Sequence, residues 1–534
     1  MNLASFLQHW GILENPFQGE EARQDPVFAR LAGVVVTGSG GAGGPTPGPD
    51  ARILHSDFDK IAGDFSRPSA AVAFGEKGSG KTAIRLQLAQ RVGAFNAANP
   101  ARRVLLAPYD DLNPVLERLI PRLAPRESRR QVKADPVSEA FNRIRLTDHV
   151  DAILSLIVGP LVDAALGEAG PARASEGTPS VELSDERRRG LRRSDLAVRK
   201  DLLLLQAVYD RPERAEDRTR RLRARLGLGL GRQSVLWGVL AWAGWIPALV
   251  VVMWTVIGAV RGVHVSAWYG VALSAVWLTA LVKVLLLDAL AGRTLARRVR
   301  RQVHVTPRSE RSLAGSLREL SPSLRESAPV TDSEPARMAL LARLVRVLRA
   351  LGYESILLVM DRADEPSLVA GDPERMRALV WPLLSNSFLQ FDGLGVKLLL
   401  PAELRHALFR ESAAFFQAAR LDKQSLIERL SWSGASLHDL CEQRLRACRA
   451  ADAGPITLQD LFEPDVPRDE LIATLDQMRQ PRDAFKFLYQ CLSEYCASTT
   501  EGLCQWRVPR PVFESVRKAQ LERLRQLAMG VRPA

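Results

Sequence analysis

Eight residues from Gly75 to Thr82 (GEKGSGKT) match the pattern G-x-x-x-x-G-K-[ST]. In such a phosphate-binding loop, or P-loop, backbone N–H groups and a helix N-terminus surround nucleotide phosphates. Lys81 would reach the β- and γ-phosphates, and Thr82 would offer its hydroxyl to Mg²⁺. The alternative is an ordinary glycine-rich turn, which the flanking residues disfavour. The pattern therefore predicts a nucleotide site made of Gly75, Glu76, Lys77, Gly78, Ser79, Gly80, Lys81 and Thr82.

A second group of reactive residues follows the apolar run 356–360, far downstream. Asp361 comes directly after this run, at the strand end where ligands bind in open α/β sheets, and we predict that it shares the Mg²⁺ with Thr82. Asp364 or Glu365 could polarise or position an attacking water, and the sequence leaves open which of the two does so. The alternative is a strand that ends in a solvated acidic turn. The predicted catalytic residues are Lys81, Asp364 and Glu365.

Short apolar strands that alternate with helices must position these residues. Residues 71–74 are predicted to be a buried strand that enters the loop, and residues 83–92 a helix that leaves it. Further strands are expected at 103–108 and 395–400, and an amphipathic helix at 336–351 precedes the strand of Asp361. This alternation predicts an α/β fold with a parallel sheet flanked by helices.

Two long charge-free segments, 233–260 and 262–282, lie between the two reactive groups. Each is long enough to cross a bilayer, which requires about 20 apolar residues. Six tryptophans fall within them, several near the ends, where an aromatic belt is expected. The alternative is a pair of helices buried in a soluble core. We predict a two-helix transmembrane hairpin.

Arginines without intervening acids flank this hairpin on both sides. By the positive-inside rule both ends face the cytoplasm, which places both termini and both reactive groups on the side where ATP is found. We therefore expect a bacterial-type inner membrane protein with two spans. Anionic lipid headgroups would account for much of the net charge of +13 without nucleic acid. The flanking arginines are Arg218, Arg220, Arg221, Arg223, Arg225 and Arg232, then Arg293, Arg297, Arg298, Arg300, Arg301 and Arg308.

Composition divides the chain into seven segments. Residues 1–50 form an N-terminal segment that ends in a glycine-rich linker, 37–50, which lacks the GK[ST] ending of a phosphate loop. The nucleotide domain is split into 51–112 and 336–435. Between them lie a helical arginine-rich insertion (113–232), the hairpin (233–290) and a polar juxtamembrane linker (291–335). Residues 170–232 are expected either to lie on the membrane surface or to form a solvated stalk, and residues 436–534 are helical.

The order of these features resembles AAA+-type P-loop ATPases, in particular the STAND and KAP-like branches. Gly75–Thr82 is similar to their Walker A loop, and residues 360–365 (MDRADE) resemble a STAND-like Walker B strand end. KAP-type ATPases also carry membrane helices between these two motifs. The resemblance implies a P-loop NTPase sheet that binds ATP and Mg²⁺, is interrupted by the hairpin and is followed by a C-terminal helical lid.

The resemblance also implies roles for further residues. Residues 480–483 (QPRD) look like the start of a lid helix whose arginine, Arg482, approaches the γ-phosphate; the alternative is a surface arginine. Residues 15–17 (NPF) resemble an N-terminal segment that packs near the adenine. In AAA+ proteins the next strand usually ends in a polar sensor residue, but here it ends in Leu400 and Pro401, which puts fast hydrolysis in doubt. In a homo-oligomer Arg405 or Arg410 could act as an arginine finger, with a surface charge as the alternative.

Three functions fit these features. The first is a membrane-anchored ATPase that couples ATP hydrolysis to a conformational change acting on an unknown protein partner. The second is a nucleotide-dependent signalling or scaffold switch with little turnover. The third is a membrane-tethered DNA-transacting ATPase, which is not favoured because no recognition motif is evident.

Overall fold

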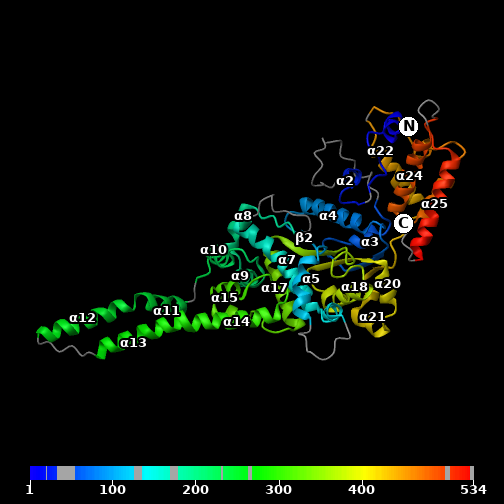
Figure 1. The fold of residues 1–534 in the computed structure, drawn as a ribbon. Coiled ribbons are helices and arrows are strands. Elements are labelled where there is room, and N and C mark those ends of the chain that lie inside the picture. The colour runs from blue at the N-terminus through cyan, green and yellow to red at the C-terminus, as the bar shows by residue number, and fades with distance from the viewer. Residues whose placement is uncertain are drawn as a thin grey trace. The chain divides into compact units, whose positions relative to one another are not determined.

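The computed structural model describes residues 1–19, 21–32, 54–124, 135–168, 178–229, 232–261, 268–450, 452–499 and 505–529. The predicted glycine-rich linker 37–50 lies outside these residues, as do residues 262–267 between the two apolar segments. The described chain is predominantly helical and contains one sheet (Figure 1).

The sheet has five strands in the order β2-β3-β4-β1-β5. Strand β1 runs parallel to β4 and β5, with Ala73 opposite Leu399 and Ile427. Every residue of β1 and β4 is buried, as expected for apolar strands covered on both faces. The α/β fold predicted from the sequence is thus confirmed. The strands are β1 Ala71–Gly75, β2 Arg103–Pro108, β3 Tyr353–Met360, β4 Leu394–Pro401 and β5 Ser425–Ile427.

The chain forms two compact units, and the boundary between them falls within β3. Unit 1 comprises Met1–Pro100, Leu358–Asp364 and Gly395–Ala534. Unit 2 comprises Ala101–Leu357 and Glu365–Leu394. Each is described by itself below.

Unit 1 contains the P-loop strand and a separate cluster of terminal helices. The first helices of the chain share a hydrophobic core with the last ones: the Phe6 and Tyr495 rings meet edge to face at 5.8 Å. Arg444 fixes the turn between the first two helices by donating 2.6 Å hydrogen bonds to the Pro16 carbonyl and to Asp25. The helices of unit 1 are α1 Leu3–His9, α2 Pro26–Ala32, α3 Phe58–Ala62, α4 Lys81–Ala98, α20 Ala402–Phe409, α21 Ala413–Ala419, α22 Gly434–Ala447, α23 Arg468–Met478, α24 Pro481–Ser498 and α25 Arg510–Ala528.

Unit 2 is built around three long helices, α7 (Leu146–Leu166), α9 (Leu196–Tyr209) and α17 (Glu334–Ala350), which pack on one another. Ten of the fourteen residues of α9 are buried, among them Leu202 to Leu205. The expectation that residues 170–232 lie on a membrane or form a solvated stalk is therefore wrong for this segment. The predicted polar linker, 291–335, contains most of helix α14 (Asp288–Gln302) and the helices α15 (Glu310–Arg318) and α16 (Pro322–Glu326), of which α15 buries Leu313 and Leu317.

Several arginines assigned to lipid by the sequence are instead used inside unit 2. Arg218 is 2 % exposed and forms ion pairs with Asp210 at 2.9 Å and Asp163 at 2.8 Å. Arg308 is 1 % exposed and donates a 2.8 Å hydrogen bond to the Ser312 carbonyl. These residues cannot contact headgroups, because Asp210 and Asp163 pair with Arg218, and the carbonyls of Ala207 and Ser312 accept hydrogen bonds from Arg308.

The two charge-free segments form helices that project from the rest of unit 2 (Figure 1). The first gives α11 (Arg232–Ala243) and α12 (Trp245–Arg261); the second gives α13 (Trp268–Val282), which continues through a π-helical turn, η4 (Lys283–Leu287), into α14 (Asp288–Gln302). Three helical stretches of the described chain are long and apolar enough to cross a membrane. Leu146–Leu166 is 72 % buried by the protein, whereas Leu236–Trp254 and Val271–Gln302 are only 6 % buried. The predicted pair is thus the pair that exposes its apolar surface.

The remaining helices of unit 2 are shorter: α5 Asn113–Leu123, α6 Pro136–Phe141, α8 Asp185–Gly190, α10 Ala215–Arg225, α18 Pro373–Val380 and α19 Asn386–Leu389.

Candidate nucleotide-binding site

The loop between β1 and α4 has the backbone geometry of a phosphate cradle. Gly78 and Gly80 have φ angles of +99° and +96°, a left-handed conformation that side chains other than glycine disfavour. A Cβ on Gly75 would lie 2.3 Å from Ser79 Oγ, so this position also requires glycine. Helix α4 begins at Lys81, and its first N–H groups, which lack intrahelical partners, face the loop end of the helix. These features suit the binding of an anion at the start of α4.

Lys81 folds back over this loop. Its ammonium donates hydrogen bonds of 2.7 Å and 2.9 Å to the carbonyls of Gly75 and Glu76. Burial lowers the pKa of Lys81, and this effect is opposed by the negative charges of Asp361, Asp364 and Glu403. An anionic partner would stabilise this desolvated ammonium, which is hydrogen-bonded only to neutral carbonyls.

Thr82 and Asp361 meet at the carboxyl end of β3. Thr82 Oγ1 donates a 2.9 Å hydrogen bond to Asp361 Oδ2. The other oxygen of Asp361 accepts a 2.9 Å bond from the backbone N–H of Arg362, whose φ of +60° turns the chain sharply after the strand. Asp361 is 1 % exposed, and burial raises its pKa, with Thr82 and Arg85 opposing the shift. The structure therefore brings together the two predicted metal-side residues.

Thr82 Oγ1 and Asp361 Oδ2 are oxygens of the kind that Mg²⁺ takes as ligands, and in the structure a 2.9 Å hydrogen bond joins them. Within the described ranges no group of three or more His, Cys, Asp or Glu side chains could hold a metal alone. Mg²⁺ in phosphate sites commonly takes only one or two protein ligands and completes its shell with phosphate and water.

The two candidate catalytic acids differ in their surroundings. Asp364 is half-buried and belongs to unit 1, and its charge acts on Lys81. Glu365 is exposed and begins a segment of unit 2. Glu403 in the first turn of α20 is a third acid at Lys81 that the sequence analysis missed, because nothing in its local pattern links it to the loop.

The start of α24 lies against the P-loop. Gln480 donates a hydrogen bond to the Glu76 carboxylate. A Cβ on Gly78 would lie 2.9 Å from Gln480 Oε1 and 3.0 Å from Arg482 Cβ, and the charge of Arg482 contributes to the lowered pKa of Lys81. The structure thus places Arg482 beside the loop, and its approach to a γ-phosphate stays a prediction. Arg405 lies within α20 and Arg410 at its C-terminal end, and their arginine-finger role stays a prediction.

Two aromatic residues near the loop were also missed. Trp432, between β5 and α22, donates a 2.9 Å hydrogen bond from Nε1 to the Ser79 carbonyl. The His55 ring meets the Trp432 ring edge to face at 5.0 Å, and burial lowers the pKa of His55. Phe17, in the segment predicted to pack near the adenine, is buried in the hydrophobic core of the terminal helices, and the packing of this segment near an adenine stays a prediction. A lone tryptophan in a polar segment gave no signal in the sequence.

The strand next to the loop ends without a polar side chain. In the register of β1 and β4, Pro401 is directly opposite Gly75, and both Leu400 and Pro401 are buried. No side chain at this strand end can donate a hydrogen bond to a water or a phosphate. The departure from the AAA+ sensor pattern is therefore present in the geometry as well.

Comparison of the chain with protein-family models, with curated proteins and with solved structures gives no significant match. The interpretation of this site consequently depends on its residues and their geometry.

Proposed function

We propose that the protein is a membrane-anchored ATPase that binds ATP with Mg²⁺ at the Gly75–Thr82 loop and uses hydrolysis to change its conformation. The observation that carries this proposal is the hydrogen bond between Thr82, directly after the loop lysine, and the buried Asp361 at the end of β3. A P-loop threonine and a strand-end aspartate in direct contact are the pair that a nucleotide-bound Mg²⁺ requires. Lys81, Asp364 and Arg482 lie around this pair and supply the other groups that act on the phosphates and the attacking water.

Each residue has a definite task in this proposal. Lys81 exchanges its bonds to the loop carbonyls for bonds to phosphate oxygens. Thr82 and Asp361 orient the Mg²⁺, which when bound neutralises charge on the β- and γ-phosphates. Asp364 accepts a hydrogen bond from the attacking water and positions it. Arg482 places a positive charge on the γ-phosphate side of the loop. Helix α24, which contains Arg482, therefore moves when that phosphate is lost.

The membrane anchor is supported by the apolar surface of α12 and α13. Trp254 is 63 % exposed, Trp268 79 % and Val256 61 %, and these are large apolar areas for a surface in contact with water. The helices of this pair pack on one another, as in a hairpin. We propose that the hairpin crosses the bilayer and that the nucleotide site faces the cytoplasm.

A nucleotide-dependent switch with little turnover is the second candidate, and Pro401 favours it. Without a polar residue opposite Gly75, one of the usual groups that orient the attacking water is absent. Such a protein would bind ATP and change shape while releasing phosphate slowly. A DNA-transacting role has no comparable support in the site.

The proposal is tested with full-length protein purified in detergent. Nucleotide binding and phosphate release are measured for the wild type beside Lys81→Ala and Asp364→Asn. We expect ATP-dependent phosphate release that both variants abolish, with binding weakened only in Lys81→Ala. Binding without release in the wild type would establish the switch, and no binding in the wild type would refute both.

A further inference from the structure

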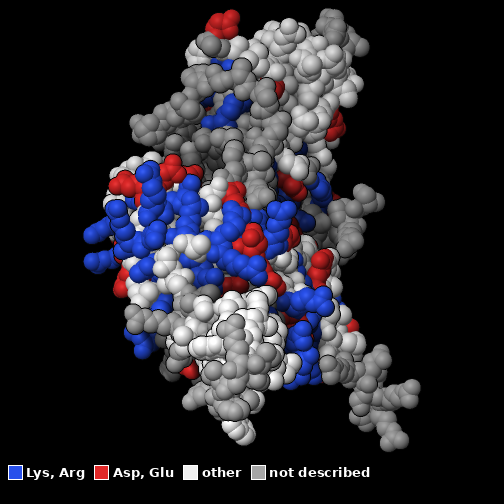
Figure 2. Space-filling view, turned by 90° about the vertical axis from the view of Figure 1, so that its left-hand side faces the viewer, with Lys and Arg blue, Asp and Glu red and all other residues white. Residues whose placement is uncertain are grey.

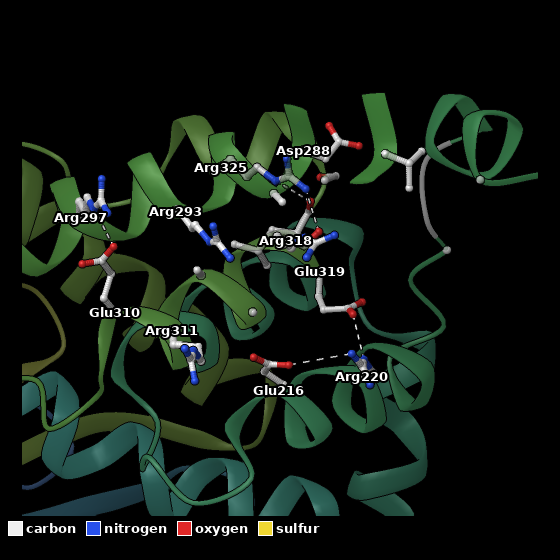
Figure 3. A pocket seen from close by; sticks show the side chains of 18 residues that line it. Glu216, Arg220, Asp288, Arg293, Arg297, Glu310, Arg311, Arg318, Glu319 and Arg325 are labelled. Atoms are coloured by element: carbon white, nitrogen blue, oxygen red, sulfur yellow. Dashed lines mark hydrogen bonds and ion pairs between the residues drawn. The ribbon is translucent and has the colours of Figure 1, made fainter. Parts of the chain in front are cut away.

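Unit 2 contains a pocket of about 830 Å³ at the base of the apolar hairpin (Figure 3). Helices α10, α14 and α15 form its walls, and Gly238 of α11 and Val284 of η4 reach its edge. Six arginines line it: Arg220, Arg293, Arg297, Arg311, Arg318 and Arg325. This pocket takes no part in the nucleotide site.

The pocket has more positive than negative charge. Against six arginines it has four carboxylates, Glu216, Asp288, Glu310 and Glu319, which leaves two net positive charges. Two of the arginines are neutralised by direct pairs: Arg297 with Glu310 at 2.7 Å and Arg220 with Glu319 at 2.9 Å.

The other arginines are available to a ligand to different degrees. Arg325 donates to the carbonyls of Leu317 and Leu320, both at 3.1 Å. Arg293, Arg311 and Arg318 are exposed, and the described residues offer their guanidinium groups no ion pair or hydrogen bond. In Figure 3 Arg293 and Arg311 extend into the space between the helices without a bonded partner. An anion in the pocket would find planar donors that can bind phosphate oxygens in pairs.

The pocket lies where the apolar surface of the hairpin ends. Leu285, Leu286 and Leu287 are each more than half exposed, and the next residue, Asp288, lines the pocket. Lys and Arg gather on the face of unit 2 from which the pale hairpin projects (Figure 2). The change from apolar to charged surface therefore occurs within one helical turn, at the pocket.

A π-helical turn lies at this border. Lys283–Leu287 departs from α-helical geometry between α13 and α14, and such π-bulges frequently mark functional sites in helices. Lys283 in this turn stacks over the Trp237 ring at 4.1 Å, which ties α11 to the second helix. The turn and this contact fix the two helices where they enter the pocket.

We propose that the pocket binds the phosphate of an anionic lipid headgroup, with Arg293, Arg311 and Arg318 as its ligands. The inference rests on the proposed insertion of the hairpin, because insertion brings headgroups to the level of Asp288. A soluble polyphosphate offers the same chemistry, but it has no acyl chain to place along the exposed leucines above the pocket. An anionic lipid is therefore the ligand that can contact both the arginines of the pocket and the exposed leucines above it.

The test uses full-length protein in detergent micelles, to which phosphatidylglycerol or phosphatidylcholine is added. Lipid retained by the protein is counted by native mass spectrometry. We expect the wild type to retain phosphatidylglycerol preferentially. Each arginine near an anionic lipid contributes about fivefold in affinity, so the double variant Arg293→Gln/Arg311→Gln should lose about 30-fold.

Arg298→Gln is the matched control, since Arg298 is an exposed arginine of α14 that does not line the pocket. It should keep the wild-type preference. Equal losses in Arg298→Gln and in the double variant would show diffuse attraction and overturn the proposal, as would a wild type without preference. Inorganic pyrophosphate that binds through the same arginines, while the lipid does not bind, would also overturn it.

This test can fail or succeed independently of the proposed function. Lipid retention in micelles needs neither ATP nor a bilayer, so a protein without ATPase activity can still pass the test. Resistance of the protein to carbonate extraction from membranes reports insertion by itself.

Discussion

Thr82 Oγ1 donates a 2.9 Å hydrogen bond to Asp361 Oδ2, although 279 residues separate them. The contact joins the helix that follows the P-loop to the end of β3, and both residues belong to unit 1. Asp361 is buried, so its charge is directed at Thr82, Arg85 and Lys81 and little at solvent.

The hydroxyl of Thr82 should set the requirement for Mg²⁺. Thr82→Ala removes an oxygen ligand, and we expect the Mg²⁺ concentration for half-maximal turnover to rise about 10- to 100-fold, as for other disrupted metal sites. Thr82→Ser keeps the oxygen and should stay close to the wild type. The measurement is a Mg²⁺ titration of phosphate release, and an unchanged titration in Thr82→Ala would contradict the assignment.

Asp364 should matter more for turnover than Glu365. Asp364 is half-buried and its charge acts on Lys81 within unit 1, whereas Glu365 is exposed to solvent. Asp364→Asn is expected to lower kcat about 10²- to 10⁴-fold with little loss of nucleotide binding, the usual effect of removing a catalytic base. Glu365→Gln serves as the comparison; if it alone stopped turnover, the roles would be reversed.

Gly78 should be intolerant of alanine. Its φ is +99°, and a Cβ would press against Gln480 and Arg482 at about 3 Å. We expect Gly78→Ala to cost about 1–2 kcal/mol for the left-handed backbone and to weaken ATP binding. Gly93 in the same α4 is the control, because a Cβ there meets nothing within 4 Å; Gly93→Ala should stabilise by up to about 1 kcal/mol. Thermal unfolding and nucleotide titration give both values.

Two histidines of unit 2 should respond to pH in opposite directions. Burial lowers the pKa of His149 to about 4, and Tyr109 lies 3.0 Å from its Nδ1. The folded pKa is below the unfolded value of 6.5, so this contribution to stability is complete above pH 6.5 and is lost as the pH falls toward 4. Between pH 6.5 and 5 the loss is about 2 kcal/mol. The destabilisation caused by His149→Gln should therefore shrink by about that amount on acidification.

His304 provides the contrast. A 2.9 Å contact with Asp148 raises its pKa, so its contribution is present below pH 6.5 and is lost as the pH rises through the raised value. His304→Gln should thus be more destabilising at pH 5 than at pH 8. Thermal unfolding of both variants at these pH values checks the two signs, and parallel pH profiles would refute the assignment.

Arg218 should be a large contributor to the stability of unit 2. It pairs with Asp210 and Asp163, and although Asp163 keeps its pair with Arg211, Arg218→Met would leave the buried Asp210 without its cationic partner at a cost of about 3–5 kcal/mol. Arg221 pairs with Glu168 but is half exposed, so Arg221→Met should cost at most about 1 kcal/mol. Similar unfolding midpoints for the two variants would contradict this distinction.

The sequence predicts those features that depend on neighbouring residues. The P-loop, the strand before Asp361 and the apolar helices are each encoded within a continuous segment, so their residue types and spacing are sufficient. Glu403 and Trp432 were missed because only the tertiary fold brings them to the loop. For the same reason the arginines of 218–223 were assigned to lipid: their partners, such as Asp163 and Glu319, are distant in the chain.

Because Thr82 and Asp361 are far apart in the sequence, they are also synthesised at different times. At about 5–20 residues per second, a ribosome that has added Thr82 needs roughly 15 to 55 seconds to add the 279 residues up to and including Asp361. During this interval β1, whose five residues are buried in the finished protein, has neither β4 nor β5 to pair with. The nascent P-loop strand is therefore a candidate for chaperone protection, and the chain cannot complete its nucleotide site until the hairpin has already left the ribosome.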